Sequence, residues 1–225
     1  MKAYLFAYNM AVAAAWLWVG VVCAMHLAQN GWSRIDLFWG MAEVPLKIAQ
    51  TAAVLEVVHA LFQLVKSPVM TTLAQVLSRL HIVWIIYQFI PSTHTYWVTL
   101  HTIAMWTLAE LIRYPFYALN LYGWAPKAML WLRYSGFLVL YPSGIAGELG
   151  SIVHALFYMS AHEEFRTFPE PMPNRFNFTI DLWLAYVAML LTYVPGTVIL
   201  FSHMLTQRKK YLASTKDRDR SSKGE

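Results

Sequence analysis

Long apolar segments alternate with short polar segments along the whole chain. Each apolar segment is at least as long as the roughly 20 residues that a helix needs to cross the hydrocarbon core of a bilayer. Because the backbone must satisfy its own hydrogen bonds in lipid, segments of this length favour α-helices. We therefore predict an all-α, polytopic membrane protein, a bundle of six transmembrane helices. The predicted spans are about residues 4–28, 41–65, 69–90, 96–119, 128–159 and 178–205.

The fifth and sixth apolar segments contain prolines at positions where a helix could be interrupted. Residues 128–159 are too many for one straight span, so this helix must tilt, protrude or break. We expect the break at residues 141–144, Tyr-Pro-Ser-Gly, because proline removes a backbone hydrogen bond. Pro195 and Gly196 predict a kink in the sixth span.

Charged residues inside the predicted spans are expected to pair, since an unpaired charge is costly in hydrocarbon. Glu56 and Arg79 are equally far along the chain from the turn at residues 66–68. An antiparallel hairpin would place them at the same depth, so we predict a buried ion pair between them. Glu110 and Arg113 lie at i,i+3 on one helical face, and we expect them to pair locally.

Two arginines indicate an anion site near one membrane surface. Arg113 and Arg133 are equidistant from Gly123, so the same reflection places them at one depth. Two arginines there would repel each other unless an anion or a carboxylate joins them. This arrangement predicts a site for phosphate or carboxylate.

Tyr141 and Glu148 are the candidates for chemistry inside the membrane. They lie seven residues apart, which is two helical turns and therefore one helical face. A carboxylate within a membrane span is a functional hypothesis by default, and a tyrosine beside it could exchange protons with a substrate. The alternative is a structural polar contact that closes the helix bundle.

Composition and charge agree with a membrane protein and suggest its orientation. The chain is 58% hydrophobic, 16% aromatic and only 13% charged, whereas soluble domains average about 25% charged residues. Residues 207–225 hold seven basic and three acidic residues, and we treat them as a basic tail that follows a single domain of residues 1–206. Because positive charge favours the cytosolic face, we predict that both termini are cytosolic. A basic tail of this kind suits anionic lipid rather than nucleic acid.

The absence of characteristic motifs argues against several enzyme classes. The sequence has no HExxH, GxSxG or P-loop motif. Cys23 is the only cysteine, and the residue six positions after it is Gln29 rather than arginine, so a cysteine-phosphatase loop is absent. We expect neither a bound metal nor a cofactor. The residues by themselves indicate a lyase or isomerase that acts on an amphipathic acyl thioester.

At these residues the chain resembles the 3-hydroxyacyl-CoA dehydratase family of very-long-chain fatty acid elongation, also called protein-tyrosine-phosphatase-like. The similarity covers about residues 50–210. Its most specific block is residues 140–148, Leu-Tyr-Pro-Ser-Gly-Ile-Ala-Gly-Glu. Further blocks are residues 55–59, 65–69, 75–79, 106–117, 132–134, 173–177 and 203–210.

The resemblance implies a six-span enzyme of the endoplasmic reticulum membrane that removes water from (3R)-3-hydroxyacyl-CoA to give the trans-2-enoyl-CoA. It implies that Tyr141 and Glu148 are the catalytic pair, and we expect Glu148 to be the base, although the opposite assignment stays open. It also implies supporting roles for Glu56, Arg79, Glu110, Arg113 and Tyr114. We expect Arg113 and Arg133 to lie near the CoA phosphates.

The resemblance leaves a non-enzymatic alternative open. A catalytically silent relative could act as a membrane scaffold for the other enzymes of the elongation cycle, namely the condensing enzyme, the ketoreductase and the enoyl reductase. These enzymes are expected partners in either case. Retention of both Tyr141 and Glu148 argues against the silent form, because a buried unpaired glutamate is costly without a use.

Overall fold

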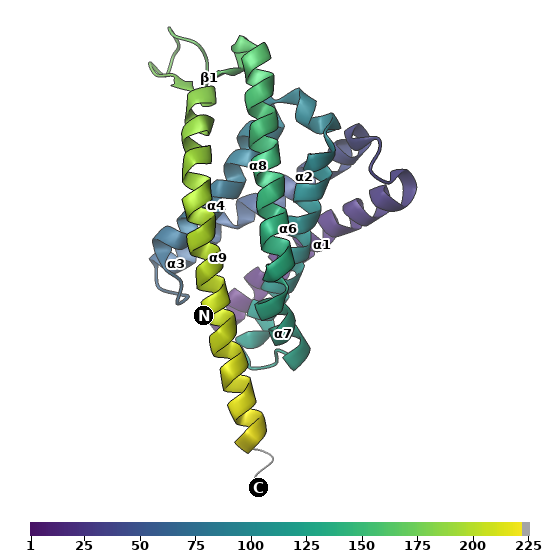
Figure 1. The fold of residues 1–225 in the computed structure, drawn as a ribbon, viewed down its shortest axis with the longest axis vertical. Helices are drawn as coiled ribbons and strands as arrows, with labels where there is room; N and C mark the ends of the chain where they lie inside the picture. The colour runs from purple at the N-terminus through teal and green to yellow at the C-terminus, as the bar shows by residue number, and fades with distance from the viewer. Residues whose placement is uncertain (222–225) are drawn as a thin grey trace.

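The computed structural model describes residues 1–221, without the side chains of Val194, His203, Lys210 and residues 212–221. The chain forms a bundle of helices that run mostly along one axis (Figure 1). The long helices are α1 (Lys2–Asn30), α2 (Ile35–Ala52), α3 (Val54–Leu61), α4 (Val69–His81), α6 (Trp97–Asn120), α7 (Lys127–Ser135), α8 (Phe137–Ala161) and α9 (Leu182–Ser221). The short elements are the π-helix η1 (Ile82–Ile86), α5 (Tyr87–Phe89), and the 3₁₀-helices η2 (Pro91–Thr95) and η3 (Glu163–Phe165).

A hairpin of two two-residue strands accompanies the helices. The strands β1 (Thr167–Phe168) and β2 (Ile180–Asp181) pair antiparallel at the end of the bundle opposite α7 (Figure 1). The Arg166 guanidinium donates to Asp181 at 2.6 Å, and the backbone N–H of Leu184 donates to the other Asp181 oxygen at 3.0 Å. Asp181 therefore caps the start of α9, which is a common role of aspartate at a helix N-terminus.

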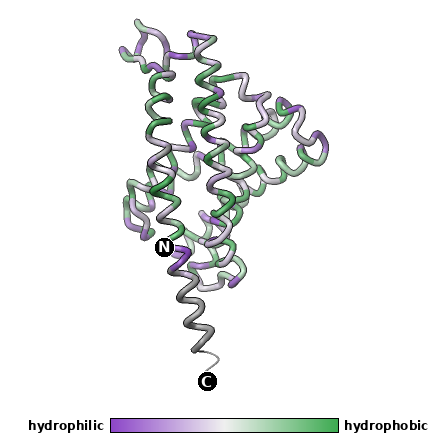
Figure 2. The backbone as a smooth tube through the Cα atoms, viewed as in Figure 1, coloured by the Kyte–Doolittle hydropathy of each residue, from purple (hydrophilic) through white to green (hydrophobic). Residues whose placement is uncertain are grey.

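Four helical segments are long and apolar enough to cross a membrane, or five if the bent pair α7–α8 forms one span. The four are Lys2–Asn30, Ile35–Leu61, Val69–Phe89 and Leu182–Lys209. The protein is therefore a polytopic membrane protein. Hydrophobic residues predominate along the helices and hydrophilic ones are frequent at the connections (Figure 2). Large hydrophobic side chains such as Leu17, Phe157 and Leu191 are exposed on the helices, which fits a lipid environment.

Helix α6 falls in the fourth predicted span but does not belong to this apolar set. It packs against α1 on one side and α8 on the other, and its buried residues include Thr102, Thr107 and Glu110. The two threonine hydroxyls donate to carbonyls one turn earlier in the same helix, at 2.8 and 2.7 Å, so their burial leaves no unpaired polar group. A helix that faces other helices rather than lipid does not need a fully apolar surface.

The break in the fifth predicted span lies at Gly136 and not at residues 141–144. Helices α7 and α8 meet there at 44°, whereas α8 continues without interruption through Pro142. The expectation of a break at the proline was therefore wrong. Pro142 removes one hydrogen bond from a helix that α6 and α9 both support, while glycine has the lowest helix propensity after proline. Pro195 likewise lies inside the continuous helix α9.

Candidate active site

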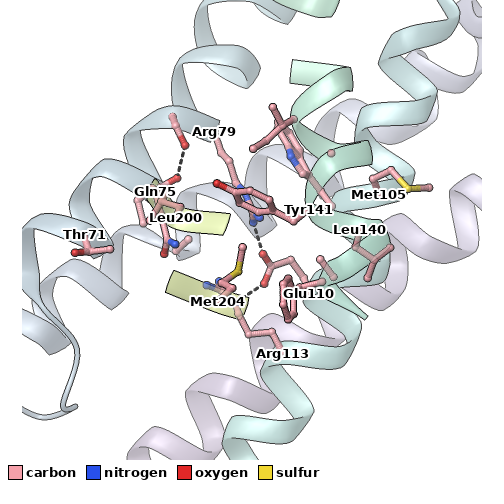
Figure 3. A pocket seen from close by; sticks show the side chains of 18 of the residues that line it. Thr71, Gln75, Arg79, Met105, Glu110, Arg113, Leu140, Tyr141, Leu200 and Met204 are labelled. Carbon is pink, nitrogen blue, oxygen red and sulfur yellow. Dashed lines mark hydrogen bonds and ion pairs between the residues drawn. The ribbon is translucent and has the colours of Figure 1, made fainter. Parts of the chain in front are cut away.

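A cavity of about 930 Å³ lies between α4, α6, α7, α8 and α9, and its wall also includes residues of α1, α2 and α3. Figure 3 shows Tyr141 projecting into it beside Arg79 and Glu110. All eight residues that the sequence nominated line this cavity: Glu56, Arg79, Glu110, Arg113, Tyr114, Arg133, Tyr141 and Glu148. Segments that are far apart in the chain thus converge on one space.

Glu148 is held by two hydrogen-bond donors from other helices. Its side chain is buried in α8, where 8% of the residue's surface is exposed. The Trp106 indole N–H donates to one carboxylate oxygen at 2.8 Å, and the Tyr193 hydroxyl donates to the other at 2.9 Å. Both oxygens accept, which is how an ionised carboxylate bonds. The sequence did not identify Trp106 or Tyr193 as site residues.

Tyr141 presents an unoccupied hydroxyl to the same cavity. Its ring stacks against Phe201 of α9, with centroids 6.0 Å apart and planes 15° apart. Its hydroxyl is buried and has no hydrogen-bond partner among the side chains that the structure describes. Because a buried hydroxyl normally has a partner, the free hydroxyl of Tyr141 is available to a ligand in the cavity.

Four charged residues beside the cavity, of which Glu110 is buried and the other three are partly exposed, pair differently from the prediction. Arg79 pairs with Glu110, and Arg113 bridges Glu110 at 2.6 Å and Glu56 at 2.8 Å (Figure 3 draws the two pairs of Glu110). Tyr114 donates to Glu56 as well. The predicted pair of Glu56 with Arg79 was therefore wrong, whereas the predicted local pair of Glu110 with Arg113 is confirmed.

The geometry of α2 and α3 explains the wrong pair. Reflection across a turn assumes two straight neighbouring helices, but the second span breaks between Ala52 and Val54. α6 then supplies partners to both sides of the hairpin. Two carboxylates and two guanidiniums form a closed cluster, which satisfies the requirement that buried charges be paired.

Arg133 is the cavity arginine that no carboxylate neutralises among the described residues. Its guanidinium donates to the Tyr117 hydroxyl at 2.9 Å and lies 5.3 Å from the centre of that ring. It belongs to α7, at the end of the cavity away from the hairpin (Figure 1). Arg113 is already paired with Glu110 and Glu56. Of the two arginines expected to share an anion site, Arg133 is therefore the remaining candidate.

Two glycines of the 140–148 block have separate structural roles. A side chain at Gly147 would overlap Thr102 of α6, so this glycine permits close packing of α6 and α8. Nothing lies within 4 Å of a Cβ added at Gly144, which lines the cavity. Gly147 thus permits a close helix contact, and Gly144 leaves space in the cavity.

No group of three or more His, Cys, Asp or Glu residues that could hold a metal ion occurs in the described part of the chain. The site is therefore made of a carboxylate with two donors, a free tyrosine hydroxyl, a neutral charge cluster and one unpaired arginine. These features belong to a polytopic, all-α membrane protein with a cavity between its helices that is lined by a carboxylate and a tyrosine hydroxyl.

Comparison with known proteins identifies the family. A family model described as "Protein tyrosine phosphatase-like protein, PTPLA" matches residues 50–214, and the chain belongs to this family. The resemblance seen in the sequence is thereby confirmed.

Curated relatives match the chain over nearly its whole length. Very-long-chain (3R)-3-hydroxyacyl-CoA dehydratase PASTICCINO 2A of Oryza sativa is 42% identical over 96% of this chain and 95% of its own. PASTICCINO 2 of Arabidopsis thaliana is 40% identical, with the same two coverages. Very-long-chain (3R)-3-hydroxyacyl-CoA dehydratase 2 of Homo sapiens is 33% identical over 96% of this chain and 83% of its own. No solved structure matches the chain.

Proposed function

We propose that this protein is a hydro-lyase that converts (3R)-3-hydroxyacyl-CoA to trans-2-enoyl-CoA in fatty acid elongation. The observation that carries the proposal is the cavity in which Glu148 and the free hydroxyl of Tyr141 face one space. Full-length similarity to proteins named very-long-chain (3R)-3-hydroxyacyl-CoA dehydratases supports the same reaction.

Glu148 acts as the base in the proposed mechanism. Its carboxylate removes the proton from C2, beside the thioester carbonyl, and the electron pair of that C–H bond forms the C2–C3 double bond. Donors on both carboxylate oxygens support this assignment, because such hydrogen bonds favour the ionised form and fix the orientation of the carboxylate.

Tyr141 acts as the acid. The C3–O bond breaks as the Tyr141 hydroxyl gives its proton to the departing oxygen, which leaves as water. This hydroxyl has no partner in the described part of the chain, which supports the role. Return of the proton from Glu148 to the tyrosinate then restores both groups, so the cycle is balanced without a cofactor.

The CoA end of the substrate is assigned to Arg133. A guanidinium without a carboxylate partner suits a phosphate, to which it can donate two parallel hydrogen bonds. The neighbouring cluster of Glu56, Arg79, Glu110 and Arg113 neutralises itself and is assigned a supporting role, in which it fixes α3, α4 and α6 around the cavity.

The proposed topology has six spans with both termini in the cytosol of an endoplasmic reticulum membrane. α6 is the span that hydropathy does not detect, since its polar residues face the protein interior. The N-terminus lies away from the β1–β2 hairpin, toward the end where α7 and the tail lie (Figure 1), which supports an even number of spans. Labelling of single cysteines at positions 66, 127 and 170, in a Cys23→Ala background, tests this topology: the first two should react from the cytosol and the third should not.

The proposed partners are the condensing enzyme, the ketoreductase and the enoyl reductase of the elongation cycle, which act on the same thioester before and after this step. A silent scaffold would bind them without turning over substrate. The free Tyr141 hydroxyl and the oriented Glu148 carboxylate favour the enzyme.

The test is incubation of the purified protein with (3R)-3-hydroxyacyl-CoA and detection of the enoyl-CoA product. Tyr141→Phe and Glu148→Gln should each abolish turnover and leave the protein folded. Tyr158→Phe is a matched control, because Tyr158 lies on the same helix but outside the cavity. Near-normal dehydration by either cavity variant would refute the assignment of the pair.

A further inference from the structure

A second hollow continues from the catalytic cavity along the seam between α4–η1 and α9. It encloses about 600 Å³, and we call it the seam groove. It is lined by Ala74, Leu77, Ser78, Leu80, His81, Trp84, Ile85, Met189, Thr192 and Tyr193. Ala74, Ser78, Thr192 and Tyr193 also line the catalytic cavity, so the two spaces meet at these residues.

The seam groove suits a hydrocarbon chain. None of its ten described lining residues is Asp, Glu, Lys or Arg, and six are apolar: Ala74, Leu77, Leu80, Trp84, Ile85 and Met189. Leu77 and Trp84 are 53% and 43% exposed, so the groove opens on the outer surface of the bundle. In a membrane protein, an apolar outer surface between helices faces the acyl chains of lipid.

The order of residues along α9 gives the groove a direction. Tyr211 stacks on Tyr134, the neighbour of Arg133, with centroids 4.4 Å apart. Tyr193, which bonds Glu148, lies about 27 Å back along the helix, at a rise of 1.5 Å per residue. Met189 of the seam groove lies one further turn away from Arg133.

This sequence of groups matches the parts of an acyl-CoA. Arg133 is the cation at one end, Tyr141 and Glu148 lie between, and the apolar groove lies beyond Tyr193. We propose that the acyl tail of the substrate passes Tyr193, leaves the catalytic cavity between α4 and α9, and lies in the seam groove with its end in the bilayer. The proposal rests on the proposed dehydratase function and adds the place of the tail.

The groove explains how the site accepts very long chains. A closed cavity of fixed volume sets an upper limit on chain length, because overpacking an apolar site is unfavourable. A groove that opens to lipid sets no such limit, since additional methylenes enter an environment as apolar as the groove itself. Selectivity therefore depends on the part of the acyl chain that lies in the groove and not on the methylenes beyond it.

The test compares two substrates, 3-hydroxyicosanoyl-CoA and 3-hydroxyoctanoyl-CoA, with the full-length protein in nanodiscs. Leu77→Trp fills the groove from α4. The ratio of kcat/KM for the long substrate to that for the short one should fall by about tenfold or more, the order by which apolar pockets discriminate chain size. Leu191→Trp is the matched control, because Leu191 is exposed on α9 and lines neither space; its ratio should equal that of the wild type.

The outcomes separate the groove from the proposed function. An unchanged ratio in an active Leu77→Trp protein would overturn the groove. Absence of dehydration of both substrates by the wild type would overturn the dehydratase function, and the groove with it.

A second measurement needs no variant. A 3-hydroxyicosanoyl-CoA with a diazirine at its terminal carbon should cross-link, in the wild type, to Leu77, Trp84 or Met189 or to surrounding lipid. Cross-links confined to other helices would also overturn the groove.

Discussion

Removal of the Tyr193 hydroxyl should slow dehydration without weakening substrate binding. In Tyr193→Phe the ring stays in place, but one oxygen of Glu148 loses the donor that lies 2.9 Å away. The Trp106 N–H at 2.8 Å still holds the other oxygen. Glu148 is then fixed at one point rather than two, and it can rotate about that contact.

The expected loss follows from the strength of one hydrogen bond to a charged group, about 1.5–3 kcal/mol. If that stabilisation is needed in the transition state, kcat should fall about ten- to 150-fold. KM should change little, because Tyr193 is a positioning residue that acts through Glu148. A structural role alone would instead lower the fraction of folded enzyme and leave kcat per folded molecule unchanged.

The assay is steady-state dehydration, with active protein counted from the folded fraction in detergent. Tyr186→Phe is the control: Tyr186 lies two turns away on the same helix, and its buried hydroxyl has no partner. Its removal should leave kcat unaltered. Wild-type kcat in Tyr193→Phe would refute the argument that two donors orient the base.

Three further outcomes are expected. Gly147→Ala should lower the unfolding temperature, since overpacking costs about 1–3 kcal/mol, whereas Gly144→Ala, with nothing within 4 Å of the added carbon, should not. Arg133→Ala should raise KM for acyl-CoA and weaken its dependence on salt, with kcat nearly unchanged; an unaltered KM would argue against phosphate binding there. Asp181, which precedes α9, has its pKa lowered by a backbone N–H at the start of that helix and by the Arg166 guanidinium. Its contribution to stability is therefore present at neutral pH and is lost as the pH falls below about 4, so the difference in unfolding temperature between wild type and Asp181→Asn should vanish in acid.

Hydropathy predicted the helices well where they face lipid. The first apolar segment corresponds to α1, and residues 69–90 correspond to α4, η1 and α5 within a residue. Break points were harder to predict, because they depend on which neighbours support the helix. α8 packs against α6 and α9 and continues through Pro142. The bend lies instead at Gly136, a position that a search for prolines does not identify.

The sequence nominated eight residues that meet at one cavity, but it missed Trp106 and Tyr193, the two donors to Glu148. All eight nominated residues line the cavity, yet the partner of Arg79 is Glu110 rather than Glu56. Reflection across one turn considers only the two helices that the turn connects. It therefore cannot predict a partner from α6, which lies later in the chain. The same reflection, applied to the connection between α8 and α9, places Pro195 at the depth of Glu148. Tyr193 lies only two residues, or about half a turn, from Pro195, so the sequence held information that could have identified Tyr193.

The distribution of charge separates the supporting residues from those that meet the substrate. Glu56, Arg79, Glu110 and Arg113 form a cluster whose charges cancel, so no ligand is needed to neutralise it, and the burial of Glu110 is compensated by two guanidiniums. Among the described residues of the cavity, the Glu148 carboxylate makes no ion pair.

Arg133 likewise makes no ion pair with the described residues. Among them, its guanidinium has one hydrogen-bond partner, the Tyr117 hydroxyl. An unmatched charge in a membrane protein is costly unless a ligand uses it. In the proposed mechanism, Arg133 binds a phosphate and Glu148 takes up a proton. An acyl-CoA supplies both, one at its head and one beside its thioester, and this complementarity indicates which end of the cavity receives which end of the substrate.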